Sequence, residues 1–179
     1  MTMLGFGQKT GQIMQMAYVV EDLEKSIDWW VNDVKTGPWF VLDSFLQPGQ
    51  LYRGELSKAD IRIAMGFAGH MCIELIQPKD DHPSVYKEII DRRGYGFHHI
   101  GIAVEDVDAQ IAAYEARGYA LAFHAAVPTG GHVAYLDDGR NEPGFIELIP
   151  ANGGTDETFT RFWRASIDWN GEDPIRPFA

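Results

Sequence analysis

The sequence contains two copies of one short pattern, and this repeat limits the fold more than any other feature. An apolar stretch that runs into Glu-Asp occurs at residues 16–23 and again at residues 100–107. The aspartate of each copy, Asp22 or Asp106, can cap a helix because its side chain accepts from the free N–H groups of the first turn. A repeated strand-to-helix pattern predicts two copies of one structural unit.

The apolar residues after each aspartate recur with helical spacing. The two trios are Leu23, Ile27 and Trp30 in the first copy and Val107, Ile111 and Tyr114 in the second. Each trio falls on one face of a helix, which must pack on a sheet.

The ends of the two copies also match, since Ile-Glu-Leu-Ile occurs within residues 71–78 and within residues 144–150. The first copy is longer inside, and we expect its extra residues in a loop near 47–49. Two further strands fit inside each copy, which we predict at 40–45 and 61–65, and at 120–124 and 133–136. The sequence therefore predicts an α+β fold in one domain, 1–179, made of two βαβββ modules that form a cupped mixed sheet. The modules span about 13–78 and 97–150, with a linker helix at 84–92 and a last helix at about 155–169.

Four polar side chains fall at equivalent places in the two modules. Side chains alternate across a strand, so the large apolar residues of each first strand belong under its helix. Gln15 and His99 then point to the opposite, cavity side, as do Glu74 and Glu147 in the last strands. Alternation puts His98 on the helix side, where we expect a structural role. A carboxylate between apolar residues is costly to bury alone, and because this occurs in both modules, a bound cation is the simplest compensation.

The segments around these residues resemble a known superfamily. Residues 73–78 and the Gly-x-Gly-x-His-His-Ile stretch at 94–100 are similar to the vicinal oxygen chelate superfamily, which includes glyoxalases, bleomycin resistance proteins and extradiol dioxygenases. The second stretch is especially similar to methylmalonyl-CoA epimerases. The resemblance implies paired βαβββ modules around one divalent metal ion held by Gln15, Glu74, His99 and Glu147. Epimerases usually carry His in place of Gln15, and this ligand set looks more like glyoxalase I.

The donor set favours a hard or borderline cation. One imidazole, two carboxylates and an amide suit Zn²⁺, Ni²⁺, Co²⁺, Mn²⁺ or Mg²⁺, and four protein ligands leave coordination positions for a substrate. Such a site supports an isomerase, epimerase or lyase that removes a proton next to a carbonyl, with Glu147 as first and Glu74 as second choice of base. His124, His132 and Phe145 are candidates for the substrate pocket.

Two other functions remain open. A non-catalytic protein that binds an aromatic compound or a drug fits the aromatic-rich segment 159–169. A ring-cleaving dioxygenase is a weaker alternative, because its iron site needs two histidines and Gln15 replaces one of them. The substrate could be a CoA thioester, a glutathione adduct or an aromatic metabolite.

Composition excludes several classes of partner. The net charge of −11 argues against nucleic acids and anionic membranes, which need clustered Lys and Arg. Aromatic residues make up 12% of the chain, which suits either an aromatic-lined cavity or core and subunit contacts. The single cysteine, Cys72, cannot form an intrachain disulfide, and no apolar stretch is long enough to span a bilayer. We therefore expect a cytoplasmic protein that acts on a small molecule, and a homodimer as in relatives.

Overall fold

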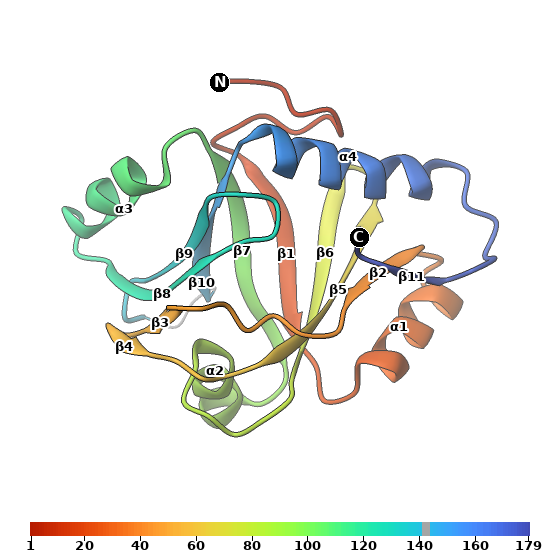
Figure 1. Ribbon diagram of the computed structural model, residues 1–179. Coiled ribbons are helices and arrows are strands. Elements are labelled where there is room, and N and C mark those ends of the chain that lie inside the picture. Colours follow the sequence, from red (N-terminus) through yellow and green to blue (C-terminus); the bar gives the residue numbers. More distant parts are fainter. Residues whose placement is uncertain (141–143) are drawn as a thin grey trace.

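One curved mixed sheet forms the centre of the molecule. The computed structural model describes residues 1–140 and 144–179. Within these residues the strands form a single eleven-stranded sheet in the order β11-β2-β5-β6-β1-β7-β10-β9-β8-β3-β4 (Figure 1). Its strands are β1 (Ile13–Val19), β2 (Trp39–Leu42), β3 (Leu51–Tyr52), β4 (Glu55–Leu56), β5 (Ile61–Ala68), β6 (Met71–Pro78), β7 (Gly96–Val104), β8 (Ala120–Ala126), β9 (His132–Asp137), β10 (Phe145–Pro150) and β11 (Ile175–Pro177). The helices are α1 (Leu23–Asn32), α2 (Val85–Arg93), α3 (Val107–Glu115) and α4 (Gly153–Ile167).

The two halves of the sheet have the same topology. In the first half, β1 pairs in parallel with β6, which continues antiparallel to β5 and then β2. In the second half, β7 pairs in parallel with β10, which continues antiparallel to β9 and then β8. The halves join where β1 runs antiparallel to β7. The predicted α+β fold of two βαβββ modules is thus confirmed.

Helices α1 and α3 form as the repeat predicts. Asp22 accepts from the N–H of Lys25 and Asp106 from the N–H of Ala109, at 3.0 and 2.9 Å. Each helix buries its apolar face on the sheet of its own module, with Leu23 and Ile27 in one cluster and Val107 in the other. Figure 1 shows these helices at opposite ends of the sheet, and α2 and α4 at its other margins.

The extra residues of the first module do more than form a loop. Residues 51–56 make a small hairpin, β3–β4, whose first strand pairs with β8 of the second module. In its turn, the guanidinium of Arg53 lies 2.7 Å from Glu88 of α2 and 2.6 Å from Asp137 of β9. The hairpin therefore ties the first module to the second.

The remaining boundaries differ slightly from the sequence-based ones. Strand β2 ends at Leu42, so Phe45 lies beyond it, and β5 continues past the predicted end to Ala68. Helix α4 begins two residues before Thr155, because Asn152 caps it by accepting from the Thr155 N–H at 2.8 Å. No helix in the described part of the chain is long and apolar enough to cross a membrane.

Candidate metal centre

Gln15, Glu74, His99 and Glu147 come together on the inner face of the sheet. They lie on β1, β6, β7 and β10, which are neighbours in the order β6-β1-β7-β10 at the junction of the modules. Alternation along each strand turns all four side chains to the same side, away from α1 and α3. All four are buried, with at most 6% of any residue exposed.

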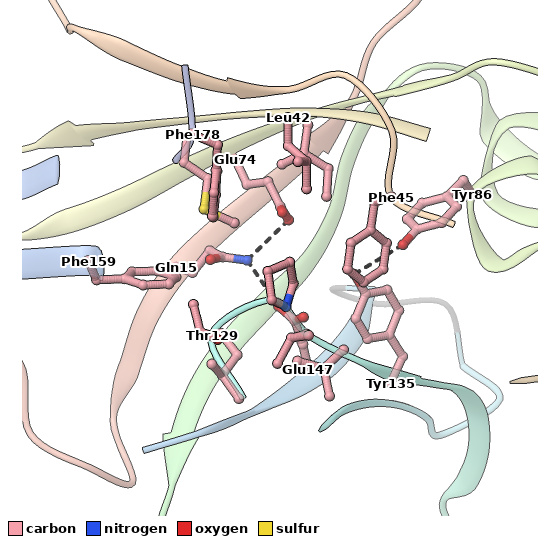
Figure 2. A pocket seen from close by; sticks show the side chains of 16 residues that line it. Gln15, Leu42, Phe45, Glu74, Tyr86, Thr129, Tyr135, Glu147, Phe159 and Phe178 are labelled. Carbon is pink, nitrogen blue, oxygen red and sulfur yellow. Dashed lines mark hydrogen bonds between the residues drawn. The ribbon is translucent and has the colours of Figure 1, made fainter. Parts of the chain in front are cut away.

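The polar atoms of this cluster are in direct contact. Gln15 Nε2 lies 3.1 Å from Glu74 Oε2, 3.0 Å from Glu147 Oε2 and 3.2 Å from His99 Nε2. His99 Nε2 lies 3.3 Å from Glu74 Oε2 and 3.1 Å from Glu147 Oε2. Figure 2 shows the amide of Gln15 between the two carboxylates.

This arrangement suits a divalent cation. Ligand atoms held about 2.1 Å from a cation in octahedral geometry are about 3 Å apart, which is close to the distances from His99 Nε2 to the two carboxylates. Glu74, His99 and Glu147 can each offer one ligand atom. Gln15 Oε1, the amide atom that a hard cation would bind, is the one buried side-chain N or O atom without a partner among the described residues. Hydrogen bonds within the protein therefore leave the cluster unsatisfied, and the residues fit a metal ion.

Burial and mutual contact shift the ionisation of the cluster. Burial raises the pKa of Glu74, and His99 only partly opposes this. Burial disfavours a protonated His99, but Glu147 and Glu74 outweigh it and raise its pKa to about 9. The two buried carboxylates thus favour the protonated, positively charged form of His99. A bound cation would supply this positive charge instead of the proton.

A β-bulge places His98 beside His99. Tyr18 of β1 pairs with Phe97 and Ala17 pairs with His99, so β7 carries one extra residue at this point. His98 consequently stacks on Tyr86, with ring centroids 5.1 Å apart, and is fully buried. The predicted helix-facing position of His98 is wrong, because the bulge breaks the alternation on which it rested.

Two hydrogen bonds orient the ring of His99. His98 Nε2 lies 3.1 Å from the carbonyl oxygen of Val85, an acceptor, so this nitrogen carries the hydrogen. His98 Nδ1 is then an acceptor for the Nδ1–H of His99, 2.8 Å away. Burial and the neighbouring His99 hold the pKa of His98 well below its usual range, which keeps that acceptor available. His99 Nε2 is left to face the cluster as a metal ligand.

Close packing of strands β1, β7 and β10 at Gly101 supports the cluster. A Cβ atom at Gly101, opposite both Gln15 and Glu147 in the sheet, would lie 2.9 Å from Gln15 Cβ and 2.8 Å from Ile149 Cδ1. Such distances are shorter than van der Waals contact. The absence of a side chain at Gly101 therefore lets β1, β7 and β10 bring their polar groups together.

The cluster opens into a cavity with about 570 Å³ of space free of protein atoms, part of it open to solvent. Besides Gln15, Glu74 and Glu147, thirteen residues line it: Leu42, Phe45, Ile63, Met65, Tyr86, Val127, Pro128, Thr129, Val133, Tyr135, Ile149, Phe159 and Phe178 (Figure 2). A polar cluster that opens into a concave, largely apolar pocket is typical of a small-molecule site.

None of the three predicted pocket residues, His124, His132 and Phe145, lines the cavity. His132 lies on the side of β9 that faces α3, where it is 3.0 Å from Asp108, and His124 packs against it. Alternation along β9 turns Val133 and Tyr135 to the cavity instead. Phe145 is on the cavity side but packs against the ring of His98 and does not line the cavity. The alternation of β9 could have located Tyr135 from the sequence, whereas nothing local indicates Tyr86 or Phe178.

Paired βαβββ modules with a buried Glu-His-Glu group at their junction define a class of two-module proteins that could bind a metal ion between the modules. The family described as the glyoxalase/bleomycin resistance protein/dioxygenase superfamily matches residues 14–135, and the chain belongs to it. No protein in a search of curated sequences matches this chain significantly.

Several solved structures share the fold at low identity. A hypothetical protein of Bacillus halodurans, BH1468, is 21% identical with a TM-score of 0.59, over 79% of this chain and 94% of its own. Methylmalonyl-CoA epimerase from Mycobacterium tuberculosis is 18% identical with a TM-score of 0.60, over 88% and 95%. A Streptomyces coelicolor methylmalonyl-CoA epimerase variant in complex with 2-nitronate-propionyl-CoA is 18% identical with a TM-score of 0.59, over 79% and 98%.

Proposed function

We propose that this protein is a metal-dependent isomerase, epimerase or lyase that removes a proton from a carbon next to a carbonyl. The observation that carries the proposal is the placement of two buried carboxylates from opposite modules, Glu74 and Glu147, around one imidazole nitrogen at a cavity. The likeness to methylmalonyl-CoA epimerases supports the reaction type and leaves the substrate open.

Gln15, Glu74, His99 and Glu147 would hold the ion, which would be Zn²⁺, Ni²⁺, Co²⁺, Mn²⁺ or Mg²⁺. When bound, a divalent cation polarises a carbonyl oxygen and makes the neighbouring C–H more acidic. The two carboxylates together balance the charge of a dication, and the Val85–His98–His99 chain presents the imidazole lone pair.

Glu147 is the proposed base and Glu74 the second carboxylate of the reaction. Both line the cavity, and the side chain of Glu147 is 8% exposed against 4% for Glu74. Since they come from opposite modules, Glu147 can accept a proton from one side of the substrate and Glu74 can return one from the other. Epimerisation and isomerisation both need these two transfers.

A second function is favoured by the aromatic lining of the cavity. A protein that binds an aromatic compound without turning it over would need Phe45, Phe159 and Phe178 but no base. The homodimer stays a prediction, which analytical ultracentrifugation would check.

Replacing Glu147 by Gln tests the proposed reaction. The variant keeps an oxygen ligand, but an amide cannot accept a proton at neutral pH. Exchange of a substrate's α-hydrogen in deuterated water, followed by NMR, should slow about a hundredfold or more in metal-loaded Glu147→Gln protein. Exchange at the wild-type rate would make Glu147 a ligand only. A wild-type protein that binds an aromatic compound tightly but exchanges nothing would instead establish the binding function.

A further inference from the structure

The wall of the cavity carries no positive charge outside the metal cluster. Ten of the sixteen lining residues are apolar, and among the described residues none that lines the cavity is Lys, Arg or His. A carboxylate or phosphate inside this space would lose its hydration without gaining a cationic side chain. The lining therefore disfavours an anionic group.

The metal cluster does not supply the missing charge. Glu74 and Glu147 carry two negative charges when they ligate a dication, and Gln15 and a ligating His99 are neutral. The cluster and its ion are then close to neutral overall. A neutral ligand meets no uncompensated charge here, whereas an anion would lie beside two carboxylates.

The hydroxyl groups in the wall are already engaged. Tyr86 and Tyr135 are within hydrogen-bonding distance of each other, with their oxygen atoms 3.4 Å apart (Figure 2). The hydroxyl of Thr129 accepts a hydrogen bond from that of Thr155 at 3.1 Å. A pair of hydroxyls has one hydrogen left to donate, so the tyrosine pair suits one neutral acceptor better than the several oxygens of a phosphate or carboxylate.

Aromatic rings from outside the repeat complete the wall. Phe159 comes from α4 and Phe178 follows β11, and neither element has a counterpart in the two modules. With Phe45, Tyr86 and Tyr135 they present five rings to the space in front of the cluster. Rings arranged in this way gain edge and offset contacts with an aromatic ligand beyond simple burial.

We infer, building on the function proposed above, that the substrate is a neutral aromatic carbonyl compound with a second oxygen next to its carbonyl. Its body fills the space between the aromatic side chains, and its two oxygens face the metal cluster. Carboxylic acids bring a charge that the wall does not balance, and the acyl group of a simple acyl-CoA thioester brings no ring to these side chains, so both are poorer ligands of this cavity.

Direct binding measurements test this inference with three probes. They are 2-hydroxyacetophenone (C6H5COCH2OH), which is neutral, phenylpyruvate, which is a slightly larger anionic aromatic carbonyl compound, and propionyl-CoA. Titration calorimetry on metal-loaded protein should show 2-hydroxyacetophenone binding at least about tenfold more tightly than phenylpyruvate. Equal or tighter binding of phenylpyruvate or propionyl-CoA would overturn the inference.

Two variants locate the binding. Phe178→Ala should weaken binding of 2-hydroxyacetophenone by about three- to tenfold, the scale of one lost aromatic contact, with metal content unchanged. Leu56→Ala is the matched control, because Leu56 is 75% exposed and does not line the cavity. Equal affinity of the Phe178→Ala and wild-type proteins would place the aromatic ligand elsewhere and overturn the inference.

Hydrogen exchange separates this inference from the proposed function. If propionyl-CoA exchanges its α-hydrogen while 2-hydroxyacetophenone neither binds nor exchanges, the substrate class is wrong and proton abstraction stands. If 2-hydroxyacetophenone binds in the cavity without exchange, proton abstraction fails and the ligand class stands.

Discussion

His99 is oriented by its neighbour in the sequence, since the Nδ1 atoms of His98 and His99 lie 2.8 Å apart and form a hydrogen bond. The bulge in β7 makes this contact, and the carbonyl oxygen of Val85 at the start of α2 decides which nitrogen of His98 accepts. The linker helix α2 therefore helps to orient His99 in the metal cluster, through the hydrogen bonds that link Val85 to His98 and His98 to His99. Partners of this kind commonly set the affinity of a metal-binding histidine.

Replacing His98 by Phe should weaken metal binding about ten- to a hundredfold, the usual effect of losing a hydrogen bond to a ligating histidine. Phenylalanine keeps a ring to stack on Tyr86 but has no acceptor for the His99 N–H. Competition with a chelator of known affinity measures the change, and circular dichroism checks the fold. His132→Phe, whose ring lies on the α3 side, is the control. Unchanged affinity in His98→Phe protein would reduce His98 to a packing residue.

Purified protein should hold about one divalent ion per chain, because ligand atoms of Glu74, His99 and Glu147 converge beside the amide of Gln15. His99→Ala should abolish tight binding, as seen by elemental analysis. Removing the ion from wild-type protein with a chelator should lower the midpoint of thermal unfolding, since metal at a hundred times its Kd stabilises by about 2.7 kcal/mol. A His99→Ala protein that retains stoichiometric metal would contradict this centre.

Gly101→Ala should destabilise the protein by about 1–3 kcal/mol, the usual cost of overpacking, and also weaken metal binding. The new methyl group would push against Gln15 Cβ and Ile149, so the strands at the junction must move apart. Denaturant unfolding and chelator competition measure the two effects. Gly153→Ala is the matched control, since nothing lies within 4 Å of a Cβ at that position. Equal behaviour of the two variants would show that the junction tolerates a side chain.

Arg53→Asn should lower the free energy of unfolding at pH 7 by about 1 kcal/mol, because Arg53 joins the hairpin to Glu88 and Asp137. Asparagine tolerates the positive φ of 47° at this turn. Lys25→Asn, which removes only an exposed ion pair, should have less effect.

This difference between wild-type and Arg53→Asn protein should depend on pH. Burial opposes ionisation of Glu88 and Asp137, but hydrogen bonds from Arg53 outweigh it and hold the pKa of each below its ordinary value, 4.5 and 3.8. A lowered pKa in the folded state adds stability above the unfolded value and loses it as the pH falls through the folded one. The difference should therefore be complete at pH 7 and shrink below about pH 4.5. Urea unfolding at several pH values checks this, and a difference that persists at pH 2 would point to packing as its source.

The sequence by itself determined the two modules and the face on which Gln15, Glu74, His99 and Glu147 lie. These features depend on short-range rules: the capping of a helix by Asp22, the helical spacing of apolar residues, and alternation along a strand. The repeat strengthens the prediction, because the same local pattern occurs twice. The two equivalent Ile-Glu-Leu segments are then expected to lie beside the central strands of the sheet.

Only the tertiary structure decided what surrounds the cluster. The bulge that turns His98 toward His99 depends on how β7 pairs with β1, and the position of Phe178 depends on pairing of β11 with β2. His124 and His132, which look like pocket residues in sequence, lie on the α3 side of the sheet, opposite Val133 and Tyr135. Pairing between strands that are distant in sequence is selected by the packing of the whole sheet, which no local pattern encodes. Apart from residues such as Tyr135, which alternation along β9 could have located, the lining of the cavity is therefore visible only once the sheet is assembled.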